Sequence, residues 1–127
     1  MKWKNALIIG ASGGIGAALS SALSASGTHV TGLSRSVDGF DITDETSVAR
    51  ILEDLEQTFD LIIVASGALE IKGALPEKSL KHISAQAMAD QFAVNAIGPA
   101  LVLRHASRLM DRAQPAQLAV LSARVGS

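Results

Sequence analysis

Apolar residues follow two spacings along the chain, and the alternation between these spacings predicts the order of the elements. Four short apolar runs, at 6–9, 29–34, 60–66 and 117–122, are typical of strands in a sheet. The segments between them repeat apolar residues at helical spacing. The predicted order is strand, helix, strand, helix, strand, helix, strand. With right-handed crossovers this order gives an α/β fold, a Rossmann-type doubly wound parallel sheet.

The first two helices are marked by their boundaries. One pattern runs from Ile15 until Gly27, and the other lies within residues 41–59, where acidic residues occupy the first turn and Thr43 is the candidate N-cap. We expect both helices to pack on the sheet through their apolar stripes.

The third helical pattern, residues 84–113, is long and is interrupted by Gly98 and Pro99. A proline there either kinks one helix or divides the pattern in two, the second helix beginning near Asn95 with Pro99 in its first turn. Asn95 is therefore also a candidate N-cap. The positions expected to face the sheet are Ala93, Ile97, Leu101, His105 and Leu109.

Composition narrows the class of protein. The 127 residues predict a single domain, 1–127, and the net charge of −1 gives no reason to expect a nucleic acid or an anionic membrane as partner. There is no cysteine and no apolar run long enough for a membrane span, so we expect a cytoplasmic protein without disulfides. The three histidines, His29, His82 and His105, have no second ligand at metal spacing, and we assign no metal.

The strongest chemical signal is "GASGGIG", residues 10–16, between the first strand and the first helix. Glycines there permit a tight turn and expose backbone N–H groups to a phosphate at a helix N-terminus. The segment lacks the Gly-Lys-Ser/Thr of a P-loop. Two dinucleotide patterns fit equally, one through Gly10, Gly14 and Gly16 and the other with Gly13 in the middle.

The end of the second strand indicates which dinucleotide binds. An acidic residue there usually binds the ribose 2′-OH of NAD, whereas a basic residue accommodates the 2′-phosphate of NADP. The sequence has Ser34 followed by Arg35, which favours NADP(H) over NAD(H). The alternative is that Arg35 is a solvated surface residue.

These motifs resemble those of the short-chain dehydrogenase/reductase family, from about Lys4 to the last residue. The family's Thr-Gly-x-x-x-Gly-x-Gly matches "IGASGGIG", its adenine-contacting Asp-Val/Ile matches Asp41 and Ile42, and its Asn after the fourth helix matches Asn95 in "VNAIGPALVL". The chain looks most like the small carbonyl-reductase and C-factor-like members. The motifs together favour the classical branch over the extended sugar-epimerase branch.

The sequence departs from the family pattern at two strand ends. Where the family has Asn-Asn-Ala-Gly, this chain has "VASG", residues 64–67, which keeps only Gly67. Where the family has Ser-Ser, the chain has Ser122 followed by Ala123, and alanine falls on the position that usually holds the catalytic serine. Ser122 is as much a candidate for a structural strand-end residue as for a catalytic one.

The resemblance implies an oxidoreductase that moves a hydride between NADP(H) and a carbonyl or alcohol substrate. It also implies a Tyr-x-x-x-Lys segment as acid/base, but the sequence contains no tyrosine. We therefore expect the cofactor-binding N-terminal half of a family member, truncated after the fifth-strand position and inactive as given. In the family the outer face of the helix at 96–112 often forms an oligomer interface, so a homo-oligomer is a further expectation.

The resemblance assigns residues to two groups. The active site would include Asn95, which anchors a water in the family's proton relay, and Ser122. The cofactor would contact Gly10, Ser12, Gly13, Gly14, Ile15, Gly16, Arg35, Asp41, Ile42, Ser66 and Gly67.

Two other interpretations stay open. The missing tyrosine and Ala123 also suit a non-catalytic dinucleotide-binding module that senses or docks through its cofactor, although such a module has no use for Asn95. A third interpretation is a truncated chain that does not fold by itself, because its last strand would expose an unpaired apolar edge.

Overall fold

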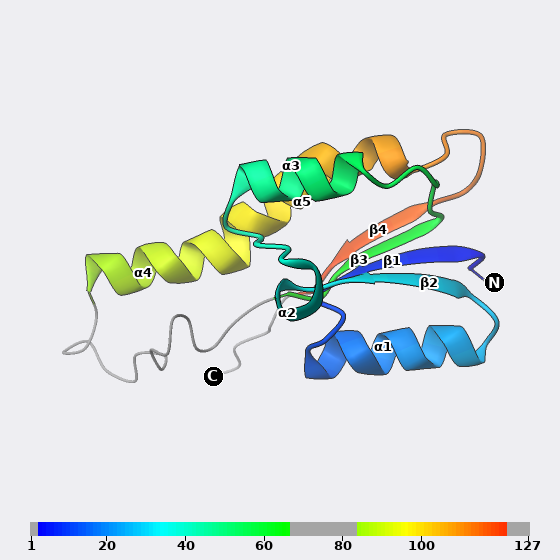
Figure 1. Cartoon of the computed structure of the whole chain (residues 1–127), viewed down its shortest axis with the longest axis horizontal. Coiled ribbons are helices and arrows are strands. Elements are labelled where there is room, and N and C mark those ends of the chain that lie inside the picture. The colour runs from blue at the N-terminus through cyan, green and yellow to red at the C-terminus, as the bar shows by residue number, and fades with distance from the viewer. Residues whose placement is uncertain (1–2, 67–83, 122–127) are drawn as a thin grey trace, which may run out of the picture.

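A computed structural model describes residues 3–66 and 84–121 and shows a parallel sheet with helices on both faces (Figure 1). The strand order is β2-β1-β3-β4, and every pair of neighbours is parallel. This confirms the α/β Rossmann-type fold, and each predicted strand is present to within two residues. The strands are β1 Asn5–Ile9, β2 His29–Leu33, β3 Leu61–Val64 and β4 Gln117–Val120.

The helices divide between the two faces of the sheet, with α1 on one side and α3 and α5 on the other (Figure 1). Within the described residues no helix is long and apolar enough to cross a membrane. The α-helices are α1 Gly14–Ala25, α2 Arg35–Asp38, α3 Glu45–Glu53, α4 Ala85–Phe92 and α5 Gly98–Ala106. A π-helical segment, η2 Ala93–Ile97, joins α4 to α5, and a 3₁₀ turn, η3 Ser107–Leu109, follows α5.

The core lies on both faces of β1. Successive residues of a strand point to opposite faces, so Leu7 and Ile9 join the cluster formed with α3 and α5, while Ala6 and Ile8 join the cluster against α1. All four side chains are at most 1% exposed. The run at 6–9 is therefore apolar throughout because β1 is a central parallel strand covered on both sides.

The N-cap of α3 is Asp44, and the prediction of Thr43 was wrong. The Asp44 side chain accepts a hydrogen bond from the backbone N–H of Thr46 at 3.0 Å. The Thr43 hydroxyl instead donates to Oδ1 of Asp41 at 2.6 Å and closes the turn before the helix. Aspartate and threonine are both favoured at the N-cap position. Their hydrogen-bond partners, which the sequence does not reveal, determine that Asp44 and not Thr43 is the cap here.

The third helical pattern is not divided in two. α4, η2 and α5 follow one another directly, with Pro99 as the second residue of α5. Asn95 lies inside η2, so its prediction as an N-cap was wrong.

The side of this helix that faces the sheet also differs from the prediction. Ile97 is 55% exposed, whereas Leu109 is buried as expected. A π turn contains more residues than an α turn, and it shifts the buried face by about one residue. The buried positions are Gly98, Pro99, Val102, Ala106 and Leu109.

Asp60 connects three strands at the amino edge of the sheet. Its carboxylate accepts hydrogen bonds from the backbone N–H groups of Lys4 and Asn5, both at 2.9 Å. Its own N–H donates to the Asn5 carbonyl at 3.0 Å, and its carbonyl accepts from the N–H of Gln117 at 2.9 Å. Asp60 therefore fixes β1, β3 and β4 relative to one another.

We predict that Asp60→Ala lowers the free energy of unfolding by about 2 kcal/mol, because two hydrogen bonds to a charged acceptor are lost. Urea unfolding followed by circular dichroism measures the change. Glu56→Ala removes an exposed carboxylate nearby and should change stability by less than about 0.5 kcal/mol. Equal losses in the two variants would contradict the role given to Asp60.

Candidate functional site

The turn after β1 is built on two glycines that other residues could not replace. Gly10 has a φ of +86°, and a Cβ atom there would lie 2.8 Å from the backbone nitrogen of Ser66. A Cβ atom at Gly16 would overlap the carbonyl oxygen of Gly10 and lie 2.8 Å from its carbonyl carbon. The two glycines thus let the first turn of α1 and the end of β3 pack against the same peptide group.

The other two glycines of the turn are not required by packing. Gly13, the N-cap of α1, has a φ of −73°, and a Cβ atom there would make an ordinary contact at 3.5 Å. A Cβ atom at Gly14 would have nothing within 4 Å. Both dinucleotide patterns proposed from the sequence therefore remain, because the packing requires only their shared members, Gly10 and Gly16.

The N-terminus of α1 is suited to an anion. No side chain caps it, and no acidic residue lies in its first turn. The first N–H groups of a helix and the positive end of its dipole attract negative charge. Next to Gly14, Ile15 is 63% exposed, which is a high value for an apolar residue and leaves an apolar surface beside this helix end.

The short helix α2, which sequence analysis missed, is positioned next to the glycine turn. The Ser34 hydroxyl accepts from the N–H of Val37 at 3.1 Å, and the Ser34 N–H donates to Oδ2 of Asp38 at 2.8 Å. The hydroxyl of Ser36 donates to that of Ser12 in the turn at 3.3 Å. The reciprocal pairing of Ser34 with residues three and four positions later is a capping signal that the sequence contains.

Arg35 is the first residue of α2, and it is exposed. Within the described ranges its guanidinium group has no hydrogen-bond or ion-pair partner. Because the Ser36–Ser12 contact holds α2 against the turn, this fixed positive charge belongs to the same edge of the sheet as the N-terminus of α1.

Ser66 follows β3 and contacts the turn through Gly10. Its hydroxyl oxygen is buried and has no hydrogen-bond partner among the described residues. A buried hydroxyl without a partner costs free energy, so this oxygen is suited to a ligand that supplies the missing hydrogen bond.

The segment before α3 contains Asp41 and Ile42. Oδ1 of Asp41 accepts from both the N–H and the hydroxyl of Thr43, and the N–H of Asp41 donates to the Ser47 hydroxyl at 3.1 Å. Ile42 is only 8% exposed. The turn therefore holds Asp41 through Ser47, a residue that sequence analysis did not select.

The structure gathers most of the predicted site at the carboxyl edge of the sheet, where the turns after β1, β2 and β3 meet (Figure 1). Asn95 does not belong to any of these turns. It lies on η2 and is exposed. Gly67 and Ser122 lie outside the described residues, so the roles predicted for them are not tested. The predicted residues gathered at this edge are Gly10, Ser12, Gly13, Gly14, Ile15, Gly16, Arg35 and Ser66.

These features fit the phosphates of a dinucleotide. Backbone N–H groups at the start of α1, the Ser66 hydroxyl and the Arg35 guanidinium group offer donors or positive charge at one edge. Neither side chain has a partner among residues 3–66 and 84–121, and the space over Gly14 is open.

The sequence comparison points the same way. Residues 6–110 match the sequence model of the NAD dependent epimerase/dehydratase family, which is most of the chain. The chain belongs to this family. No curated protein sequence matches it significantly.

Solved structures of dehydrogenases share the fold. A small-chain dehydrogenase is 26% identical, with a TM-score of 0.77, and the alignment covers 94% of this chain and 59% of that protein. A small-chain dehydrogenase in complex with NADPH gives the same identity and score, with 94% and 50% covered. A short-chain dehydrogenase from Streptomyces avermitilis, at 22% identity, TM-score 0.79 and coverage of 94% and 49%, shows the fold alone.

The chain spans about half of the length of these dehydrogenases. The comparisons thus place the chain in the NAD dependent epimerase/dehydratase family and give it the fold of these dehydrogenases, one of which was solved in complex with NADPH. The matching sequence model is that of the epimerases, while the structures above are dehydrogenases, so the classical branch and the carbonyl-reductase subtype stay predictions.

We predict opposite outcomes for two neighbouring glycine-to-alanine substitutions. Gly16→Ala should lower the free energy of unfolding by at least about 3 kcal/mol, because its Cβ atom overlaps backbone that cannot move alone. Gly14→Ala should change it by no more than about 1 kcal/mol, because space is open there and alanine favours a helix. Chemical denaturation of both variants measures the difference, and similar values would show that the turn is not packed as described.

Proposed function

We propose that the whole protein is an NADP(H)-dependent oxidoreductase of the short-chain dehydrogenase/reductase type that acts on a carbonyl or alcohol substrate, and that these 127 residues hold the cofactor. One observation carries the proposal: the N-terminus of α1, with open space at Gly14, lies at the same turn as the buried hydroxyl of Ser66, which has no partner among the described residues. The buried hydroxyl is costly in a protein that binds nothing there, and the exposed helix end beside it is open to an anion.

The glycine turn would hold the pyrophosphate. Backbone N–H groups at the start of α1, from Gly14 onward, would donate to its oxygens, and the helix dipole would favour its charge. Ser12, held by Ser36 at 3.3 Å, would border the same group. Gly10 and Gly16 would act indirectly, by giving the turn its shape.

Arg35 would select the cofactor. A guanidinium group donates two parallel hydrogen bonds to a phosphate, and no described residue competes for that of Arg35. Ser34 carries no negative charge, so it cannot act as the acidic residue that binds a ribose 2′-OH in NAD. The Asp38 carboxylate already accepts a hydrogen bond from the Ser34 N–H at 2.8 Å. These contacts support a 2′-phosphate on the adenosine ribose, hence NADP(H).

The remaining assignments follow the family resemblance. Asp41 and Ile42 would border the adenine, while Ser66 and Gly67 would lie toward the nicotinamide. Asn95 would hold a water of the proton relay, and Ser122 would stand at the substrate. The absence of cysteine agrees with a cytoplasmic location.

The proposed reaction requires both a cofactor and a proton donor, and these 127 residues provide for only the cofactor. The nicotinamide supplies hydride transfer when it is bound. Reduction of a carbonyl also requires a proton donor of suitable pKa at the oxygen. The 127 residues contain no tyrosine, and a serine without an activating base is a poor donor. We therefore expect binding and orientation of the cofactor from these residues, without turnover.

A non-catalytic dinucleotide-binding module is the second candidate, and the absence of tyrosine favours it. The two candidates differ in the full-length gene product. Oxidation of NADPH with a panel of aldehydes and ketones supports the enzyme, whereas NADPH binding without any turnover supports the module.

We predict that Ser66→Ala has opposite effects on stability and on binding. The free protein should be unchanged or more stable, because an unsatisfied buried hydroxyl is removed. Its affinity for NADPH should fall about tenfold, the equivalent of one hydrogen bond. Thermal melts and isothermal titration calorimetry measure the two quantities.

Ser24→Ala is the matched control for Ser66→Ala, because Ser24 is an exposed serine of α1 far along the helix from its N-terminus. It should leave the NADPH affinity unchanged. Unchanged affinity in Ser66→Ala as well would remove Ser66 from the site.

We predict that Arg35→Asp weakens NADPH binding about 10- to 100-fold, through loss of a charge-assisted contact, and leaves NADH binding equal or stronger. Fluorescence titration of the reduced cofactors measures both affinities. Arg50→Asp, which makes the same charge change at an exposed position of α3, should not alter the ratio of the two. If the ratio is the same in parent and Arg35→Asp, then Arg35 does not recognise the 2′-phosphate.

A further inference from the structure

Gly98, the first residue of α5, is in close contact with the segment before α3. A Cβ atom at Gly98 would lie 2.8 Å from Cγ1 of Ile42, 3.0 Å from the carbonyl oxygen of Ile42, and 3.0 Å from the carbonyl oxygen of Ala93 in η2. Gly98 is buried and has helical dihedral angles of −56° and −54°, so a positive φ is not the reason for glycine here. The reason is space for Ile42.

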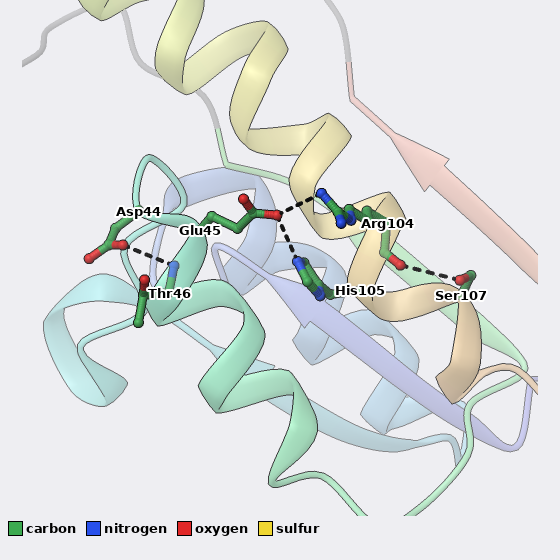
Figure 2. A network of polar contacts seen from close by, with 6 residues as sticks. All are labelled: Asp44, Glu45, Thr46, Arg104, His105 and Ser107. Carbon is green, nitrogen blue, oxygen red and sulfur yellow. Dashed lines mark hydrogen bonds and ion pairs between the residues drawn. The ribbon is translucent and has the colours of Figure 1, made fainter.

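A second contact joins the same two parts of the chain on the other side. Oε2 of Glu45, the first residue of α3, lies 3.2 Å from Nη1 of Arg104 and 3.1 Å from Nε2 of His105, both on α5 (Figure 2). Asp44 caps α3 directly before Glu45. Residues 41–45 are therefore attached to α5 at both ends, by an apolar contact at Ile42 and by polar contacts at Glu45.

From these contacts we infer that Gly98 is a positioning residue for cofactor binding. It lets α5 lie against Ile42 and thereby sets the position of Asp41 and Ile42, the two residues proposed to border the adenine. The same glycine directly follows η2, which carries Asn95. The segment proposed to border the adenine and the helix that carries Asn95 are therefore packed directly against each other.

This inference rests on the proposed function, and it concerns only the adenine half of the cofactor. A methyl group at position 98 would displace Ile42, because two of its three close contacts are to backbone oxygens that cannot rotate away. The glycine turn and Ser66 make no contact with Gly98 at these distances. Displacement should therefore affect ligands that contain adenosine more than ligands that lack it.

The experiment is to measure the affinities of Gly98→Ala for NADPH, for 2′,5′-ADP and for reduced nicotinamide mononucleotide. We expect the affinities for NADPH and 2′,5′-ADP to fall about tenfold or more, the equivalent of one lost contact, and that for the mononucleotide to stay within about twofold of the parent. An equal loss for all three ligands, or no loss for 2′,5′-ADP, would overturn the inference.

Val102→Ala is the matched control, because Val102 is fully buried one turn further along α5 and its truncation removes atoms instead of adding one against Ile42. It should lower stability by leaving a cavity but should keep the ratio of 2′,5′-ADP to mononucleotide affinity. A parent protein that binds neither NADPH nor 2′,5′-ADP would instead refute the proposed function itself.

A measurement on the unmodified protein covers the case in which Gly98→Ala does not fold. Amide hydrogen exchange of residues 93–98 should slow when 2′,5′-ADP binds, because the adenine segment then holds Ile42 more firmly against Gly98. Protection confined to the glycine turn and α2, with none at 93–98, would overturn the inference.

Discussion

The contact of three elements with the peptide group of Gly10 is the constraint on which the rest of this structure depends. The first turn of α1 approaches it through Gly16, and the end of β3 approaches it through Ser66. The N–H groups of Gly10 and Ala11 also donate to the Leu33 carbonyl at the end of β2, at 2.8 and 3.1 Å. One glycine-rich turn therefore fixes the relative positions of three strand ends and one helix end.

The carboxyl edge of the sheet acquires its polarity from this arrangement. α1 begins directly after the turn with Gly13 as its N-cap, so no N-cap side chain covers the positive end of its dipole. α2 contacts the same turn, because the Ser36 hydroxyl donates a hydrogen bond to the hydroxyl of Ser12. A donor-rich edge is the consequence of this close packing among small residues.

Much of this fold was predictable because its signals are local. The run at 6–9 is apolar throughout because both faces of β1 are covered. Gly10 and Gly16 are glycines because the backbone of the turn approaches α1 and Ser66 closely at these two positions. The N-cap of α3 was not predictable from the sequence. The Thr43 hydroxyl donates a hydrogen bond to Asp41 instead of capping the helix, so the cap falls to Asp44. The unpaired Ser66 hydroxyl and the Gly98 contact are likewise tertiary features that neighbouring residues do not reveal.

The π segment η2 has a consequence for the spacing of the helix that contains it. Each residue of an α-helix turns the chain by about 100°. Deleting one residue from 93–97 would therefore rotate α4 by that angle relative to α5, whose buried face is fixed by Val102 and Ala106. Phe92, now 59% exposed, would turn to another side. The length of this segment, as much as its composition, sets the direction in which α4 presents its side chains.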